Sequence, residues 1–192
     1  INRNGYIIVQ NGVLYTQLLN DPIRFIEGEA KLINNKLIFK DLTANLDYDN
    51  GNKISPKTFN TRINGDIDLT NFFNPLYNLK INAKNAFFRL LSLDIYGRTN
   101  LDIAIAGRDT VSIIGKIEPQ EVNVFYEFAT EDIGSALAED KGTIMSYNLN
   151  IPLRNKAFFQ NSQIDAEING ELNLSQTGYQ EMDFGGQIIV ED

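Results

Sequence analysis

The stretch IDAEINGELNLS, residues 164–175, alternates apolar or glycine residues with polar residues over its whole length. In a β-strand, successive side chains point to opposite faces, so such a segment has one apolar face and one wet face. The same period of two recurs in INGDIDLT, residues 63–70, and in shorter runs around residues 79–83, 101–105, 122–128 and 147–153. The pattern predicts an all-β protein built from one-sided strands.

Short polar and glycine-containing segments separate these runs and predict tight turns, and therefore mostly antiparallel pairing. The turn candidates are Asn11-Gly12, Asn34-Asn35, residues 49–52 and residues 107–109. Two stretches leave alternatives open. Residues 13–19 fit a strand or a short helix, and residues 130–142 fit a short helix or a loop. We therefore expect at most one short helix, near residues 131–141.

A glycine followed by alternating residues recurs at Gly28, Gly65, Gly170 and Gly186. The spacing is irregular, which excludes the familiar fixed-period solenoids and favours one β unit stacked repeatedly. No segment has the composition of a linker, so we expect a single β-repeat module over residues 1–192. Because the sequence begins at Ile1 without a methionine, we also expect it to be a fragment of a longer protein.

Composition narrows the possible functions. The net charge of −8 disfavours binding to nucleic acid and electrostatic attachment to an anionic membrane. Cysteine and histidine are absent, which excludes disulfides, thiolate metal sites and the commonest general base. No apolar run approaches the length of a membrane-spanning helix. We expect no enzyme activity, no cofactor and no metal.

Two acidic features are weak candidates for chemistry. Residues 47–51 faintly resemble a calcium loop, but its fifth and twelfth positions hold Gly51 and Thr58 in place of acidic ligands. Asp66 and Asp68 share one face of a strand, yet that is the polar face, where charged residues are expected anyway. A solvated surface is the better interpretation of both features.

One-sided strands need something to cover their apolar face. A closed sandwich buries two such faces against each other, whereas a sheet folded lengthwise leaves an apolar groove that can hold acyl chains. Periodicity leaves both open, and the clusters Phe87-Phe88 and Phe158-Phe159 fit either a core or a ligand lining. We expect a charge at Ile103 or Leu149 to block lipid movement along such a groove. The candidate lining residues are Ile67, Leu69, Leu79, Ile81, Leu101, Ile103, Ile105, Val124, Tyr126, Leu149, Ile151, Ile164, Ile168, Leu172 and Leu174.

Several segments resemble one protein family. DIYGRTNLDIAIAG, residues 94–107, resembles a signature of the TamB family, in which a Tyr-Gly-Arg-like strand leads into an alternating strand that ends in glycine. Residues 151–172 resemble the carboxy-proximal region of that family, and GGQIIVED, residues 185–192, is similar to the strand that follows it. The opening segments, residues 5–12 and 25–28, fit more loosely.

The resemblance implies an AsmA-like envelope protein of a diderm bacterium, anchored in the inner membrane and crossing the periplasm toward an outer-membrane β-barrel partner. It implies a β-taco fold, a long sheet folded lengthwise over an apolar groove that shields the acyl chains of phospholipids in transit between the two membranes. It offers no catalytic residues. The main alternative is an assembly factor for outer-membrane β-barrel proteins or autotransporters that acts through unpaired strand edges. A β-solenoid spacer with a filled core is a blander alternative.

Overall fold

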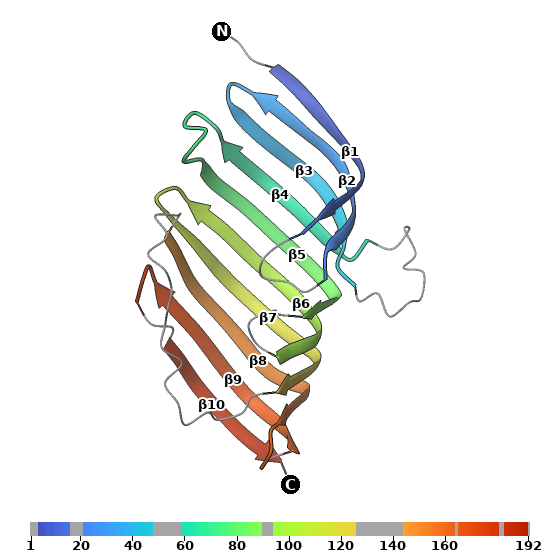
Figure 1. Cartoon of the computed structure of the whole chain (residues 1–192), viewed down its shortest axis with the longest axis vertical. Coiled ribbons are helices and arrows are strands. Elements are labelled where there is room, and N and C mark those ends of the chain that lie inside the picture. Colours follow the sequence, from blue (N-terminus) through green and yellow to red (C-terminus); the bar gives the residue numbers. More distant parts are fainter. Residues whose placement is uncertain are drawn as a thin grey trace.

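The computed structural model describes residues 4–15, 21–47, 59–89, 94–125, 144–163, 165–180 and 183–191. These residues form a single sheet of ten strands, which lie side by side in the order of the sequence (Figure 1). No helix occurs among them, so the all-β prediction is confirmed. The expected short helix near residues 131–141 lies outside the described residues.

The strands are β1 (Asn4–Leu14), β2 (Ile23–Ile33), β3 (Lys36–Asn45), β4 (Thr61–Asp68), β5 (Leu76–Arg89), β6 (Asp94–Gly107), β7 (Thr110–Phe125), β8 (Ile144–Gln160), β9 (Asp165–Thr177) and β10 (Asp183–Glu191). Every neighbouring pair is antiparallel except β7 and β8, which run parallel. The prediction of mostly antiparallel pairing is therefore confirmed. Residues 126–143, which connect the parallel pair, lie outside the described residues.

The predicted turns fare differently. Asn34-Asn35 joins β2 to β3, and both residues have the positive φ angles, 49° and 69°, that tight hairpins need. Arg108 and Asp109 join β6 to β7. The prediction of a turn at Asn11-Gly12 is wrong, because this pair lies inside β1 at a β-bulge, where Asn11 has a φ of 52°. An asparagine in a left-handed conformation suits a bulge as well as a turn. The predicted turn at residues 49–52 lies outside the described residues.

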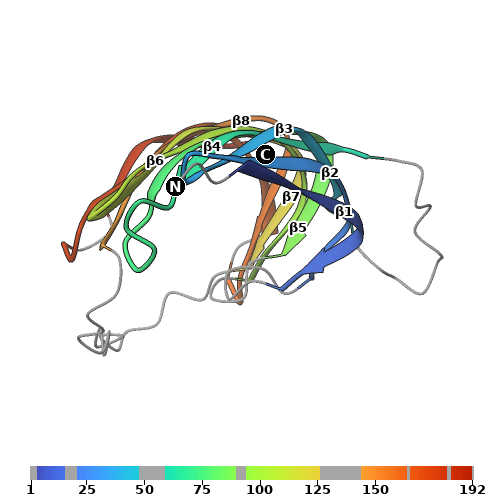
Figure 2. The same ribbon diagram turned by 90° about the horizontal axis from the view of Figure 1, so that it is seen from above.

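Bulges of the same kind recur along the sheet and bend its strands. Asp41 in β3, Asn85 in β5 and Lys156 in β8 each have positive φ, at 54°, 50° and 39°, and each lies where the register of its strand shifts. A bulge adds one or more unpaired residues to one strand, which kinks it and increases its twist. The sheet is accordingly strongly curved when seen along the stack, and its strands curl over at one side (Figure 2).

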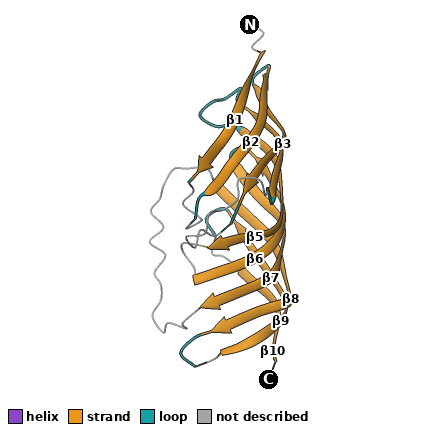
Figure 3. Ribbon diagram, turned by 90° about the vertical axis from the view of Figure 1, so that its right-hand side faces the viewer, coloured by secondary structure: helices purple, strands orange, loops and turns teal. Residues whose placement is uncertain are grey.

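The sheet has one layer. The only extensive contacts between described strands are those between neighbours in the sheet. The ten strands follow one another along the long axis of the molecule (Figure 3). The prediction of an elongated repeat sheet is confirmed, and no facing sheet closes a sandwich among the described residues.

The recurring glycines have a steric reason. Gly65 and Gly170 have φ angles of 123° and 135°, which L-residues with side chains rarely adopt. A Cβ added at Gly65 would lie 2.1 Å from the carbonyl oxygen of Asn78, and one added at Gly170 would lie 2.0 Å from that of Gln187. These glycines therefore let the next strand come close, which explains the weak repeat in the sequence.

We predict that Gly65→Ala lowers the free energy of unfolding by about 2 kcal/mol or more, because the new methyl group overlaps the backbone of β5. Gly185→Ala is the matched control, since a Cβ there meets nothing within 4 Å. Chemical denaturation followed by circular dichroism measures both. Equal stability of the two variants would show that close strand approach does not explain the glycines.

Candidate functional site

Strand pairing joins the apolar positions into continuous rows. In one row, Ile63 of β4 pairs with Ile81, which pairs with Ile103 of β6. The row continues through Gly115 and Leu149 to Leu174. We call this side of the sheet the apolar face. Its central positions are Leu37, Phe39, Leu42 and Ala44 on β3, Thr61, Ile63, Gly65 and Ile67 on β4, Tyr77, Leu79, Ile81 and Ala83 on β5, Leu101, Ile103 and Ile105 on β6, Val111, Ile113, Gly115 and Ile117 on β7, Tyr147, Leu149 and Ile151 on β8, and Leu172 and Leu174 on β9.

The structure brings most of the predicted lining residues together on this face. They are Ile67, Leu79, Ile81, Leu101, Ile103, Ile105, Val124, Leu149, Ile151, Ile168, Leu172 and Leu174. Leu69 lies just beyond the end of β4, where its backbone N–H donates to the carbonyl oxygen of Asn35 at 2.8 Å. Tyr126 and Ile164 lie outside the described residues. Whether any of them lines a lipid path stays a prediction.

Sequence reasoning missed the part of the apolar face that β3 contributes. The apolar positions Leu37 and Phe39 change phase at Leu42 and Ala44, because the bulge at Asp41 adds residues to the strand. If every second residue of the sequence is assigned to the same face, the residues after the bulge are assigned to the wrong face. The signal that could have found it is a polar pair between two alternating runs, as at residues 40–41 and again at residues 84–85.

The apolar face carries no charge. Outside the bulges, no Asp, Glu, Lys or Arg occupies this side of any of the ten strands, over the positions that the structure describes. The polar residues on it are neutral, such as Thr61, Tyr77 and Gln176. A surface of this kind over a whole sheet favours contact with hydrocarbon rather than with water.

The apolar face lies on the inner side of the curve, as alanines show. Ala83, Ala86 and Ala157 on the apolar face are at most 3% exposed, whereas Ala104 and Ala106 on the opposite face are exposed. Side chains of the same size are thus crowded on one side and open on the other. We assign the apolar face to the concave side of the sheet in Figure 2.

Only part of the apolar face is filled. Two small clusters form where the strands bend, one around Ala83, Ala86 and Leu46 and the other around Leu153 and Ala157. Phe159 packs against the second cluster, so the core interpretation fits this ring. Away from these clusters, residues such as Leu79, Ile81 and Ile105 are only half-buried. Their side chains stay partly exposed on the concave side, which a closed core would not allow.

The opposite face is polar, and ion pairs and hydrogen bonds join side chains of neighbouring strands across it. The Nζ atom of Lys36 lies 3.2 Å from the carboxylate of Asp66, which also accepts a hydrogen bond from the Asn78 amide at 3.1 Å. Asp102 forms the same kind of pair with Lys80 and Asn82. Such exposed pairs add little stability each but keep this face wetted. This arrangement confirms the polar-face interpretation of Asp66.

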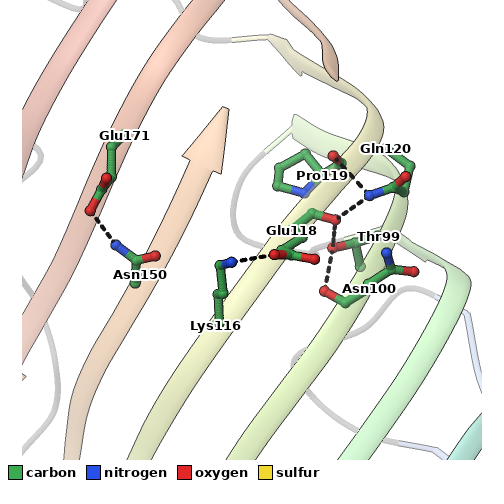
Figure 4. Close-up of polar contacts among 8 residues, drawn as sticks. All are labelled: Thr99, Asn100, Lys116, Glu118, Pro119, Gln120, Asn150 and Glu171. Atoms are coloured by element: carbon green, nitrogen blue, oxygen red, sulfur yellow. Dashed lines mark hydrogen bonds and ion pairs between the residues drawn. The ribbon is translucent and has the colours of Figure 1, made fainter. Parts of the chain in front are cut away.

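The polar pairs continue across β7, β8 and β9, where Asn150 donates to Glu171 at 2.6 Å (Figure 4). Lys116 forms an ion pair with Glu118, and this hydrogen bond lowers the pKa of the Glu118 carboxyl. At the neighbouring bulge, the buried hydroxyl of Thr99 donates to the carbonyl oxygen of Glu118 at 2.9 Å. The Thr99 hydroxyl thereby gives a hydrogen-bond partner to a backbone carbonyl at the bulge, where strand pairing is interrupted.

No cluster of three or more metal-binding side chains occurs among the described residues. The calcium-like segment extends beyond them, since residues 48–51 are not described. Within the described part of the chain, no helix is long and apolar enough to cross a membrane.

Hydrogen bonds tie three neighbouring hairpins together along one margin of the sheet. The connection between β4 and β5, residues 69–75, reaches back to the β2–β3 turn through Leu69 and Asn35. On its other side, the Asn74 amide donates to the Asp109 carboxylate at 2.6 Å, and Arg108 donates to the Asn74 carbonyl oxygen at 3.1 Å. The β4–β5 loop is therefore braced from both sides.

Asp68 closes the near end of this loop. Its carboxylate accepts hydrogen bonds from the Thr70 hydroxyl at 2.5 Å and from the Thr70 backbone N–H at 2.9 Å. These bonds hold the pKa of Asp68 below its ordinary value. A lowered pKa in the folded state means that the ionised form stabilises the fold above the ordinary pKa. That stabilisation is lost as the pH falls through the lowered value.

We predict that Asp68→Asn slightly destabilises the protein at pH 7 and that its difference from the wild type shrinks as the pH falls below the ordinary range of an aspartate. Urea midpoints between pH 7 and pH 3 measure the difference. In a Thr70→Val background the pH dependence should be much smaller, because the hydroxyl donor is gone. A difference that does not vary with pH would contradict the assignment.

Both edge strands of the described sheet expose apolar side chains. Tyr6, Ile7 and Ile8 of β1 are exposed, and Ile188, Ile189 and Val190 of β10 are each about half exposed. β1 contains no charged residue, and the two charges of β10, Asp183 and Glu191, stand at its ends. Edge strands of soluble proteins are ordinarily protected by charges, prolines or cover, so these edges are suited to pairing with another strand.

No protein-family model, curated protein or solved structure matches the chain. Three features of the structure bear on function: the uncharged apolar face, the margin at which hydrogen bonds join the β2–β3, β4–β5 and β6–β7 connections, and the two edge strands with exposed apolar side chains.

Proposed function

We propose that the apolar face shields the acyl chains of phospholipids, as one segment of a bridge-like periplasmic protein that carries lipid between the inner and outer membranes. The observation that supports this most is a concave, uncharged face that crosses the whole sheet and meets no second layer among the described strands. The resemblance of residues 94–107 and 185–192 to TamB motifs supports the envelope setting.

The energetics suit acyl chains. Each methylene group removed from water is worth about 0.8 kcal/mol, so an apolar lining offsets most of the cost of taking a chain out of a bilayer. Headgroups require water, and an open concave face leaves them a way to it. A fully closed core offers neither property.

The dimensions suit a path rather than a pocket. Neighbouring strands lie about 4.8 Å apart, so a stack of ten strands extends on the order of 45 Å. The hydrocarbon core of a bilayer is about 30 Å thick, and one lipid fills half of it. The apolar face is thus roughly three times as long as one lipid tail. Tails can therefore slide along it from strand to strand.

The structure also shows where the face can be altered safely. Ile103 and Leu149 are only 8% and 9% exposed, so a charge at either position tests folding as much as transport. Leu79 and Ile105 are half-buried and pair with each other in the neighbouring row of the same face. Changes intended to block lipid are better placed at these two residues.

Photo-crosslinking in cells tests the proposal. A benzoylphenylalanine at Ile105 should capture phospholipid, because this side chain faces the apolar side. The same group at Ala104, the next residue of β6 and exposed on the polar face, is the matched control and should capture none. Lipid captured equally at both positions, or at neither, would contradict the proposal.

The exposed apolar side chains of the edge strands favour a second candidate function. An exposed strand such as β10 can accept a client strand by β-augmentation, as an assembly factor for outer-membrane β-barrel proteins or autotransporters requires. A crosslinker at Ile189 separates the two functions. Capture of outer-membrane protein at Ile189, with no lipid captured at Ile105, favours the assembly factor.

A further inference from the structure

Two phenylalanine side chains project from the margin at which hydrogen bonds join the β2–β3, β4–β5 and β6–β7 connections. Phe72 and Phe73 lie in the loop between β4 and β5, and their side chains are 73% and 96% exposed. Their rings meet edge to face with centroids 5.7 Å apart. In Figure 2 this loop bends below the margin of the sheet, toward the concave side. We refer to this pair as the Phe72–Phe73 tip.

The exposure of the tip is not a result of a loose loop. Asp68 caps Thr70 at one end, and the Asn74 backbone N–H donates to the Asn71 carbonyl oxygen at 3.2 Å. The Asn74 amide donates to the Asp109 carboxylate and Arg108 donates to the Asn74 carbonyl oxygen, and these bonds fix the other end. Hydrogen bonds on both sides therefore hold two large apolar rings away from the sheet. Because the loop is already ordered, binding of the rings to a partner costs little free energy for ordering the loop.

The chemistry of the tip indicates its partner. Residues 69–76 contain no charged side chain, and the charged groups in contact with them, Asp68, Arg108 and Asp109, are engaged in the hydrogen bonds that hold the loop. The amides of Asn71 and Asn74 flank the two rings. Aromatic rings beside neutral polar groups suit the boundary between lipid headgroups and acyl chains, where amphipathic side chains gather.

Size separates a bilayer from a protein partner. A stable protein interface buries about 800 Å² on each side, whereas two phenylalanines bury on the order of 300–500 Å². Among residues 69–76, the one other exposed large apolar side chain is Leu76, the first residue of β5, at 37%. The tip is too small for a protein interface of ordinary size but sufficient for shallow insertion into a membrane.

We propose that the Phe72–Phe73 tip inserts reversibly into the interface of a lipid bilayer and holds the margin of the sheet against a membrane surface. The contact is apolar, so it needs no anionic lipid and changes little with salt. It is weak, comparable to or below the binding of one myristoyl chain, with an association constant of about 10⁴ M⁻¹. It does not depend on acyl chains occupying the apolar face.

Fluorescence of a single tryptophan tests this contact, because the chain has no tryptophan of its own. Phe73→Trp in the full chain is titrated with phosphatidylcholine vesicles. We expect a blue shift of its emission, and quenching when the lipids carry bromine on their acyl chains. Tyr15→Trp is the matched control. This tyrosine is 79% exposed and follows β1 at the opposite margin of the sheet, where Leu14 pairs with Ile23, so its tryptophan should show neither change.

Vesicle co-sedimentation completes the test. Phe72→Ser with Phe73→Ser should reduce the bound fraction about tenfold or more, whereas Tyr15→Ser should leave it within about twofold. Raising the salt concentration to about 0.5 M should not release the protein, because salt screens charges and this contact is apolar. Three results overturn the proposal: no vesicle binding by the unchanged chain, equal loss in both variants, or loss of a self-associated state by the double variant without any vesicle binding. The last would assign the tip to a second copy of the chain.

Discussion

The structure depends on one constraint: a single layer of two-faced strands must keep its apolar face out of water without a second layer to cover it. Curvature meets part of this constraint by crowding Ala83, Ala86 and Ala157 on the concave side. It cannot meet all of it, because residues away from the two small clusters, such as Leu79 and Ile105, stay half-buried. The remaining apolar surface is what a lipid tail would cover.

Bulges and glycines are the means by which the sheet bends. Left-handed residues such as Asp41 and Asn85 break the register, and glycines such as Gly65 let the next backbone approach closely. Both devices act on the backbone, so they leave the alternation of side chains intact on either side of each bend. The rows of apolar residues therefore continue across the sheet while its strands curl.

The sequence predicts the strands and their faces well because alternation is a local property. Ile81, Ile103 and Leu174 were expected on one face, and strand pairing places them there. It predicts the bends poorly, since Asn11-Gly12 has the composition of a turn and forms a bulge. The sequence does not indicate the exposure of the Phe72–Phe73 tip, for another reason. Adjacent phenylalanines resemble core until the hydrogen bonds around Asn74 show that the loop holds them outward.

The central claim is that the concave apolar face holds acyl chains, and the most direct measurement is the phospholipid content of the protein purified without detergent, determined by mass spectrometry. We expect phospholipid near or above one molecule per chain. Leu79→Glu should deplete it, and Lys80→Glu, the adjacent change on the polar face, should not, with both variants folded by circular dichroism. Folded protein free of phospholipid, or equal lipid content in both variants, would contradict the account.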